Sequence, residues 1–331
     1  MPPDVSLRRR TTGNSVTNKL TIGTRGSPLA LAQAHDVKRR LLAAHDDLTE
    51  DTVAIHVMST AGDRILDRHL MLAGGKGLFT KEIEDALLAG DIDLAVHSCK
   101  DVPTTLPDGL TLAAFLEREN PHDVFLSADG SPFDALPNGA TLGTASLRRR
   151  AQALRLRPDL KVVNFRGNVD TRLAKLKAGE AHGTFLARAG LNRLGKDIGG
   201  ETLDAERFLP APAQGIVTIE IREVDTATAD RLNPLHHPAS GTAALAERAF
   251  LQALDGSCRT PIAAHARVTG DRLTMTGQLL AVDGQQLFEE TGDAPLVDAA
   301  ALGRDLGLKE RARAGETFFD QLKQDAERVV A

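Results

Sequence analysis

The chain has 331 residues, of which 42% are apolar and 26% charged, and this balance is typical of soluble globular proteins with two or three domains. Its 40 Lys and Arg residues against 45 Asp and Glu residues give a net charge of −5, which argues against a general binder of phosphate backbones. Aromatic residues make up only 3%, so surfaces for base stacking are scarce and we expect no nucleic-acid partner.

The cellular setting follows from the cysteines and the hydropathy pattern. Two cysteines, Cys99 and Cys258, are too few for a disulfide framework and suit a reducing compartment. No run of eighteen apolar residues occurs, so we expect no membrane span. Residues 1–18 are basic and rich in Ser and Thr but lack the apolar stretch of a secretory signal, which predicts a disordered tail, with a transit peptide as the alternative. We therefore expect a cytoplasmic protein.

The first unit, 19–116, alternates strands and helices. Ser27 followed by Pro28 is typical of a helix start, and Gly90 of a helix end. A long polar connection is typical of a functional or mobile loop. In chain order the pattern predicts a strand over 20–23, a helix from 27, a strand over 53–58, the polar connection over 60–77, a helix over 79–89 and a strand over 91–97.

The second unit, 117–214, contains three strand-to-helix repeats and ends in a Pro-containing crossing. The strand predicted over 216–221 is expected to rejoin the first sheet, which makes the first domain 19–116 with 215–235. Two crossings between two doubly wound α/β lobes predict a hinged cleft, like that of periplasmic binding proteins. The repeats are 141–142 into 146–156, 161–165 into 169–178, and 184–187 into 189–194.

The third unit, 236–331, has a different pattern. A helix with a Ser240 cap is predicted over 240–254, followed by alternating runs broken at Gly270-Asp271 and Asp283-Gly284. The C-terminal segment is helical. We expect a small α+β domain.

Basic residues recur where strands give way to helices, in 22–33, 96–102, 142–152, 163–173 and 186–194. The carboxyl edge of an open α/β sheet is where ligands bind. Cations at a helix N-terminus oppose the helix dipole, by about 0.3–1 kcal/mol each, and a bound anion would remove the conflict. The pattern predicts a small ligand with several negative charges, held between the sheet edges.

Eight motifs carry a family resemblance. They are TRGSPLALAQ (24–33), GGKGLF (74–79), AVHSCKDVP (95–103), GTASLRRR (143–150), RGNVDTRL (166–173), AGLNRLG (189–195), AQGIVTIE (213–220) and DGSCRTPI (255–262). With these motifs in this order, the chain resembles the porphobilinogen deaminases (hydroxymethylbilane synthases) from about Leu20 to the C-terminal helices.

The resemblance implies a transferase of tetrapyrrole biosynthesis that joins four porphobilinogen molecules head to tail, releases ammonia and forms hydroxymethylbilane. The family builds its product on a dipyrromethane cofactor, and the resemblance places the thioether attachment at Cys258. It also implies a monomer whose product passes to uroporphyrinogen-III synthase. The alternative from another class is a non-catalytic two-lobe module that binds organic acids.

Asp101 is the expected catalytic residue. Taken alone, it could form a surface ion pair or cap a helix. A carboxylate close to a pyrrole N–H would stabilise the cation left by the loss of ammonia, and Lys100 beside it should keep Asp101 ionised. The resemblance assigns catalysis to Asp101.

The remaining site residues are expected to hold carboxylates, which Arg can bind through two parallel hydrogen bonds. Each also has a simpler interpretation. Arg148 and Arg149 could be solvated helix residues, and Ser27 could be an N-cap. Arg193 could be a helix C-cap, and Gln214 could be a hinge residue. We expect cofactor binding by Lys100, Asp101, Thr144, Ser146, Arg148 and Arg149, substrate binding by Arg25, Ser27, Arg166, Arg172, Arg193 and Gln214, and loop roles for Lys76 and Phe79.

Ala145 and Leu72 depart from the residues common in the family. Ala145 removes a hydroxyl that could donate to a cofactor carboxylate, and Leu72 lacks a basic side chain. The ten histidines show no paired metal-ligand spacing, so we expect no metal.

Overall fold

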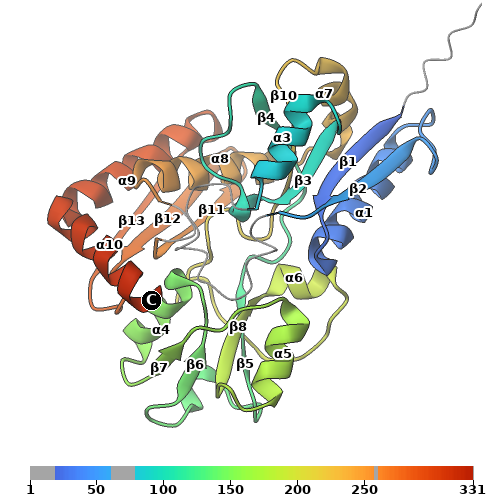
Figure 1. The fold of residues 1–331 in the computed structure, drawn as a ribbon. Coiled ribbons are helices and arrows are strands. Elements are labelled where there is room, and N and C mark those ends of the chain that lie inside the picture. Colours follow the sequence, from blue (N-terminus) through green and yellow to red (C-terminus); the bar gives the residue numbers. More distant parts are fainter. Residues whose placement is uncertain (1–18, 61–78, 257–259, 331) are drawn as a thin grey trace, which may run out of the picture.

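A computed structural model describes residues 19–60, 79–256 and 260–330 (Figure 1). The described residues form three sheets, two of five strands and one of three. The expected tail over 1–18, most of the connection over 60–77, and the predicted site residues Lys76 and Cys258 lie outside this range.

The first sheet has the order β2-β1-β3-β10-β4. Its strands are β1 (Leu20–Arg25), β2 (Val53–Met58), β3 (Leu94–Ser98), β4 (Leu110–Phe115) and β10 (Val217–Arg222). Strands β1, β2 and β3 are parallel, whereas β10 runs antiparallel between β3 and β4. The predicted return of 216–221 to this sheet is confirmed.

Helices cover both faces of the first sheet. Helix α1 (Pro28–Ala44) buries Val37 and Leu41 on one face, and α3 (Lys81–Ala89) buries Ile83 and Leu87 on the other. The side chain of Ser27 accepts a hydrogen bond from the backbone N–H of Ala30, which satisfies one of the free donors at the start of α1.

The second sheet has the order β7-β6-β8-β5-β9. Its strands are β5 (Asp123–Ser127), β6 (Thr141–Gly143), β7 (Lys161–Val163), β8 (Gly183–Ala187) and β9 (Glu201–Thr202). Helix α4 (Leu147–Leu156) packs on one face, and α5 (Val169–Lys177) and α6 (Arg188–Arg193) pack on the other. The α4 face contains buried phenylalanines, among them Phe185 and Phe208 with ring centroids 4.8 Å apart.

The third sheet is the predicted meander of β11 (Ile262–Thr269), β12 (Arg272–Leu280) and β13 (Leu287–Pro295). Its buried face packs against α8 (Pro238–Ala253) and α9 (Ala299–Ala314). These helices approach closely, because a Cβ at Gly303 would lie 2.0 Å from the carbonyl oxygen of Ala246. The remaining helices of the described ranges are α7 (Thr226–Leu232), α10 (Glu316–Val330) and the short 3₁₀ turns η1 (Cys99–Asp101), η2 (Phe133–Ala135), η3 (Asn233–Leu235) and η4 (Leu296–Asp298).

The predicted fold class, two doubly wound α/β lobes and a small α+β unit, is confirmed (Figure 1). The predicted cap of α8 is wrong. His237 is the N-cap and its imidazole accepts from the backbone N–H of Ser240, because Pro238 has a fixed φ and no N–H and therefore takes the first helical position. Strands β4, β5 and β9 are not among the elements that the sequence predicts.

One buried carboxylate joins the three units. Glu247 on α8 is fully buried and forms an ion pair with Arg118 in the first crossing, with Nη1 2.7 Å from Oε1. Its other contacts are the backbone N–H groups of Ala213 in the second crossing and Ala266 in β11. Both crossings between the lobes are therefore fixed to the third unit.

Replacing Arg118 with Met should lower the free energy of unfolding by about 3–5 kcal/mol, because it leaves the Glu247 charge buried without its partner. Urea denaturation at pH 7 measures this loss. The matched control is R207M, which removes an exposed ion pair with Asp134 and should cost about 0–1 kcal/mol. Equal losses for the two variants would contradict the role of Glu247.

Candidate active site

A small cavity of about 60 Å³ lies at the carboxyl edge of the first sheet. Four predicted residues line it: Arg25 at the end of β1, Ser27 at the start of α1, Phe79 before α3, and Asp101 in η1. The Arg25 guanidinium stacks over the Phe79 ring, with Cζ 4.2 Å from the centroid. The Asp101 side chain is exposed, so its carboxylate is accessible to a ligand.

The cavity wall also includes residues to which the sequence analysis assigns no role. Gln33 on α1 donates from Nε2 to Oγ of Ser98, 2.9 Å away, and His97 comes from the end of β3. Helical spacing marks Gln33 as the residue before the apolar position Ala34, but no sequence signal points to its contact with β3.

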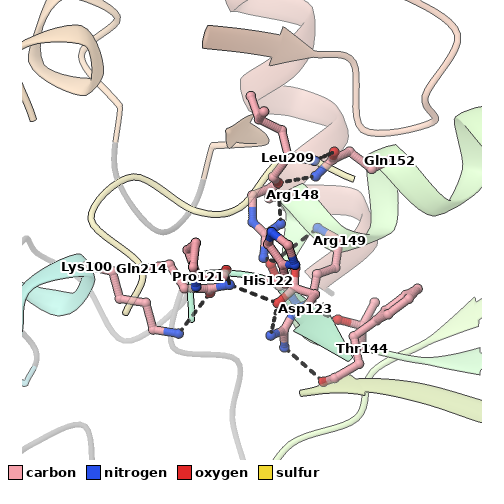
Figure 2. Close-up of polar contacts among 12 residues, drawn as sticks. Lys100, Pro121, His122, Asp123, Thr144, Arg148, Arg149, Gln152, Leu209 and Gln214 are labelled. Atoms are coloured by element: carbon pink, nitrogen blue, oxygen red, sulfur yellow. Dashed lines mark hydrogen bonds and ion pairs between the residues drawn. The ribbon is translucent and has the colours of Figure 1, made fainter. Parts of the chain in front are cut away.

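A second group of residues surrounds Asp123, the first residue of β5 (Figure 2). Its carboxylate accepts from Nη2 of Arg148 at 2.6 Å and from Nη2 of Arg149 at 2.7 Å. Asp123 is 0% exposed, and both arginines are buried. The sequence pattern predicts an anion at these two arginines, and in the structure that anion is a carboxylate of the protein itself.

The remaining donors of the two arginines are partly used. Nη1 of Arg148 donates to the Leu209 carbonyl at 2.7 Å, and Nη1 of Arg149 donates to the Phe185 carbonyl at 2.9 Å. Nε of Arg149 is buried and has no hydrogen-bond acceptor among the described residues. A buried N–H donor without a partner costs about 1–3 kcal/mol, so an acceptor supplied by a ligand would be stabilising.

Gln214 connects the two lobes at the second crossing (Figure 2). Its Nε2 donates to the Pro121 carbonyl at 2.6 Å and to Asp123 at 3.1 Å, and its Oε1 accepts from Nζ of Lys100 at 3.2 Å. Gln214 therefore joins the end of the first sheet to the start of β5. Gln214 thus lies at the crossing between the lobes, as a hinge residue would, and it also contacts the predicted binding residue Lys100.

The three other predicted arginines lie on the second lobe. Nε of Arg172 donates to the Gly167 carbonyl at 2.9 Å, and Nη2 of Arg193 donates to the Gly215 carbonyl at 2.7 Å. The positive charges of Arg149 and Arg166 act on Arg172. The structure thus brings Arg149, Arg166 and Arg172 into one region of positive potential, whereas Arg193 lies against the crossing.

The pKa values indicate a surplus of positive charge. Burial alone would raise the pKa of Asp123, but the ion pairs with Arg148 and Arg149 lower it well below its usual range. Burial lowers the pKa of Lys100 to about 8, although Asp101 partly opposes this effect. Burial and the neighbouring charges of Arg149 and Arg166 lower the pKa of Arg172 to about 10. The cations Lys100, Arg148, Arg149, Arg166 and Arg172 therefore outnumber the carboxylates of Asp101 and Asp123, which favours a ligand with negative charges.

Thr144 and Ser146 shape the start of α4. The Ser146 side chain accepts from the backbone N–H of Arg149 at 3.4 Å, and Oγ1 of Thr144 accepts from the backbone N–H of Ser146 at 3.2 Å. These contacts aim the first turn of α4 at Asp123.

A larger hollow of about 890 Å³ lies between α8, the third sheet and the first crossing. None of the predicted site residues that the structure describes line it.

The model of the family described as "Porphobilinogen deaminase, dipyromethane cofactor binding domain" matches residues 20–230. The model described as "Porphobilinogen deaminase, C-terminal domain" matches residues 242–311. The chain belongs to the porphobilinogen deaminase family. The family resemblance noted from the motifs is confirmed, and the alternative of a non-catalytic organic-acid module is not favoured.

Relatives cover almost the whole chain. The porphobilinogen deaminase of Nitrobacter winogradskyi is 55% identical over 300 residues, which are 90% of this chain and 95% of the relative. That of Paracoccus denitrificans is 51% identical over 304 residues, which are 92% and 97%. Among solved structures, the methionine-binding protein MetQ is 14% identical with a TM-score of 0.39, over 70% of this chain and 92% of that chain. The family assignment comes from the sequence relatives and not from this weak likeness.

Replacing Asp123 with Asn should lower the free energy of unfolding by about 3–5 kcal/mol at pH 7, because two buried guanidiniums lose their counter-charge. The pKa of Asp123 is lower in the folded protein than in the unfolded chain. Its charge therefore stabilises the fold above about pH 4, and this stabilisation is lost as the pH falls below that value. The difference in the free energy of unfolding between wild type and D123N should therefore shrink as the pH falls below about 4.

Urea denaturation at a series of pH values measures this difference. The matched control is D293N, which removes an exposed partner of Arg272 and should change stability by less than about 1 kcal/mol at every pH. A D123N loss that stays constant between neutral and acidic pH would contradict the assigned ion pairs.

Proposed function

We propose that this protein is a transferase that joins four porphobilinogen molecules head to tail, with release of ammonia, to form hydroxymethylbilane. The observation that supports it best is the surplus of buried positive charge, since Arg148 and Arg149 share the single carboxylate of Asp123, and Lys100, with Asp101 beside it, donates to the neutral amide of Gln214. Each porphobilinogen ring carries an acetate and a propionate. A chain of such rings needs several cations in one place.

The residues at β5 and α4 fit a dipyrromethane cofactor. Nε of Arg149 is a buried donor without an acceptor among the described residues, and Arg172 is held among like charges. An acidic ligand would satisfy the first and relieve the second. When bound, the cofactor supplies the pyrrole carbon from which the product chain grows. We propose Cys258 as its attachment point, and Lys100, Thr144, Ser146, Arg148 and Arg149 as its binding residues, with Asp101 in contact.

Asp101 performs the central chemistry in this proposal. Its exposed carboxylate lies in the cavity with Arg25 and Ser27. Placed near the pyrrole N–H, it stabilises the positive charge that develops on the ring as the carbon–nitrogen bond breaks. Arg25 and Ser27 bind the acid groups of the incoming substrate, and Arg166, Arg172, Arg193 and Gln214 bind those of the growing chain.

Further proposals concern domain limits and cellular setting. We propose domains over 19–116 with 215–235, 117–214 and 236–331, which agree with the membership of the three sheets. A cytoplasmic monomer that passes its product to uroporphyrinogen-III synthase completes the proposal. Within the ranges described, none of the helices has both the length and the apolar character needed to span a membrane.

The variant D101N should lose turnover by at least about 100-fold, because a neutral amide cannot stabilise the developing cation. Ammonia release from porphobilinogen measures turnover, and intact mass shows that the cofactor remains bound. The matched control is D108N, an exposed aspartate outside the cavity, which should retain wild-type turnover. Full activity of D101N would remove Asp101 from its assigned role.

Intact-mass analysis tests the attachment site. The wild-type protein should carry the added mass of two pyrrole rings, and C258S should lack it. The matched control is C99S, which should keep the added mass, because Cys99 is buried and burial raises its pKa to about 11. An active wild-type protein without added mass would refute the covalent cofactor.

A further inference from the structure

The layer between α3 and the first sheet contains an ionisable group of three buried residues. His97 on β3 is 5% exposed, Glu220 on β10 is 0% exposed, and Glu84 on α3 is 6% exposed. Such burial is costly for any charge that lacks a partner. The proposed roles of the cavity residues use none of the three, although His97 lines the cavity beside Asp101.

The contacts within this layer are specific. Nε2 of His97 lies 3.1 Å from Oε2 of Glu220, which the antiparallel pairing of β3 and β10 brings alongside it. The second oxygen of Glu220 and one oxygen of Glu84 are buried and have no hydrogen-bond donor among the described residues. Within the described ranges, no group of three His, Cys, Asp or Glu side chains has the arrangement of a metal site. Each of these oxygens has a lone pair that can accept a proton.

The charges in the layer interact. Burial raises the pKa of Glu84, and the nearby Glu220 charge raises it further, against the effects of Thr80 and His97. A proton on Glu84 and an ion pair between His97 and Glu220 would leave the layer neutral. The elements around His97 carry several charged groups. They are Glu220 and Arg222 on β10, Lys81, Glu82, Glu84 and Asp85 on α3, and Arg25 and Asp101 at the cavity.

The proposed function, on which this inference rests, requires two proton movements in each cycle. The carbon–nitrogen bond breaks, its electron pair stays with the nitrogen, and the nitrogen takes up one proton and leaves as ammonia. When the new carbon–carbon bond forms, the attacking ring carbon loses its proton, and the electrons of that carbon–hydrogen bond restore the aromatic ring. The proton taken up by ammonia and the proton lost from carbon balance.

We propose that His97 carries this proton. As the imidazolium it gives a proton to the departing ammonia, and as the neutral imidazole it then accepts the proton from the ring carbon. Glu220 stabilises the imidazolium through their contact, and Glu84 keeps the layer neutral. His97 is thereby a second catalytic residue beside Asp101, reached from the buried side of the cavity.

The variant H97Q separates proton transfer from structure, since the Gln amide can still donate to Glu220 but cannot carry a proton. We expect kcat for ammonia release to fall by about 100-fold while KM changes little. Wild-type kcat in H97Q would overturn the proposal and leave the proposed function intact. Absence of ammonia release by the wild-type protein would instead refute the proposed function itself.

The variant E220Q tests the charge behind His97. Loss of the carboxylate removes the group that stabilises the imidazolium, so kcat for ammonia release should fall by about 10-fold or more while KM changes little. The matched control is E310Q, which replaces an equally buried carboxyl group on α9 in the third unit, and its kcat should match wild type. A wild-type kcat in E220Q would overturn the proposal.

Discussion

The two ion pairs of Asp123 are the interaction on which the second lobe and the binding region depend. Arg148 and Arg149 lie at the start of a helix, where the dipole disfavours cations, and both are buried. Asp123 makes this arrangement stable because one carboxylate accepts from both guanidiniums and from Gln214. The same contacts fix the first residue of β5, the first turn of α4 and the second crossing.

This carboxylate does not neutralise the region completely, and the proposed function rests on the surplus of positive charge. Lys100 and Arg172 have lowered pKa values, and one donor of Arg149 has no acceptor among the described residues. In the proposed function, the cavity at the first sheet, with Asp101, supplies chemistry, whereas the cations at the second sheet supply binding. Gln214 connects the two parts through Lys100 and Asp123.

Local sequence signals predicted the parts of the fold that short-range chemistry controls. The Ser27 cap, the 53–58 strand and the Gly90 helix end follow from neighbouring residues alone. The role of Asp123 depends on residues about 25 positions away, and β5 follows a polar crossing, so no local pattern marks it. His97 lies within a recognised motif, but its contact with Glu220 spans 123 positions. The family motifs supplied most of the proposed site residues, whereas the protein's own counter-ion and the buried layer behind the cavity needed the structure.

The most direct test of the surplus charge is a crystal structure of the purified protein with whatever it carries. We expect carboxylate groups of a bound pyrrole ligand within hydrogen-bond distance of Nε of Arg149 and of the Arg172 guanidinium. The role of the surplus charge would be contradicted if Nε of Arg149 and the Arg172 guanidinium contacted only water or protein oxygens while a pyrrole ligand was bound elsewhere.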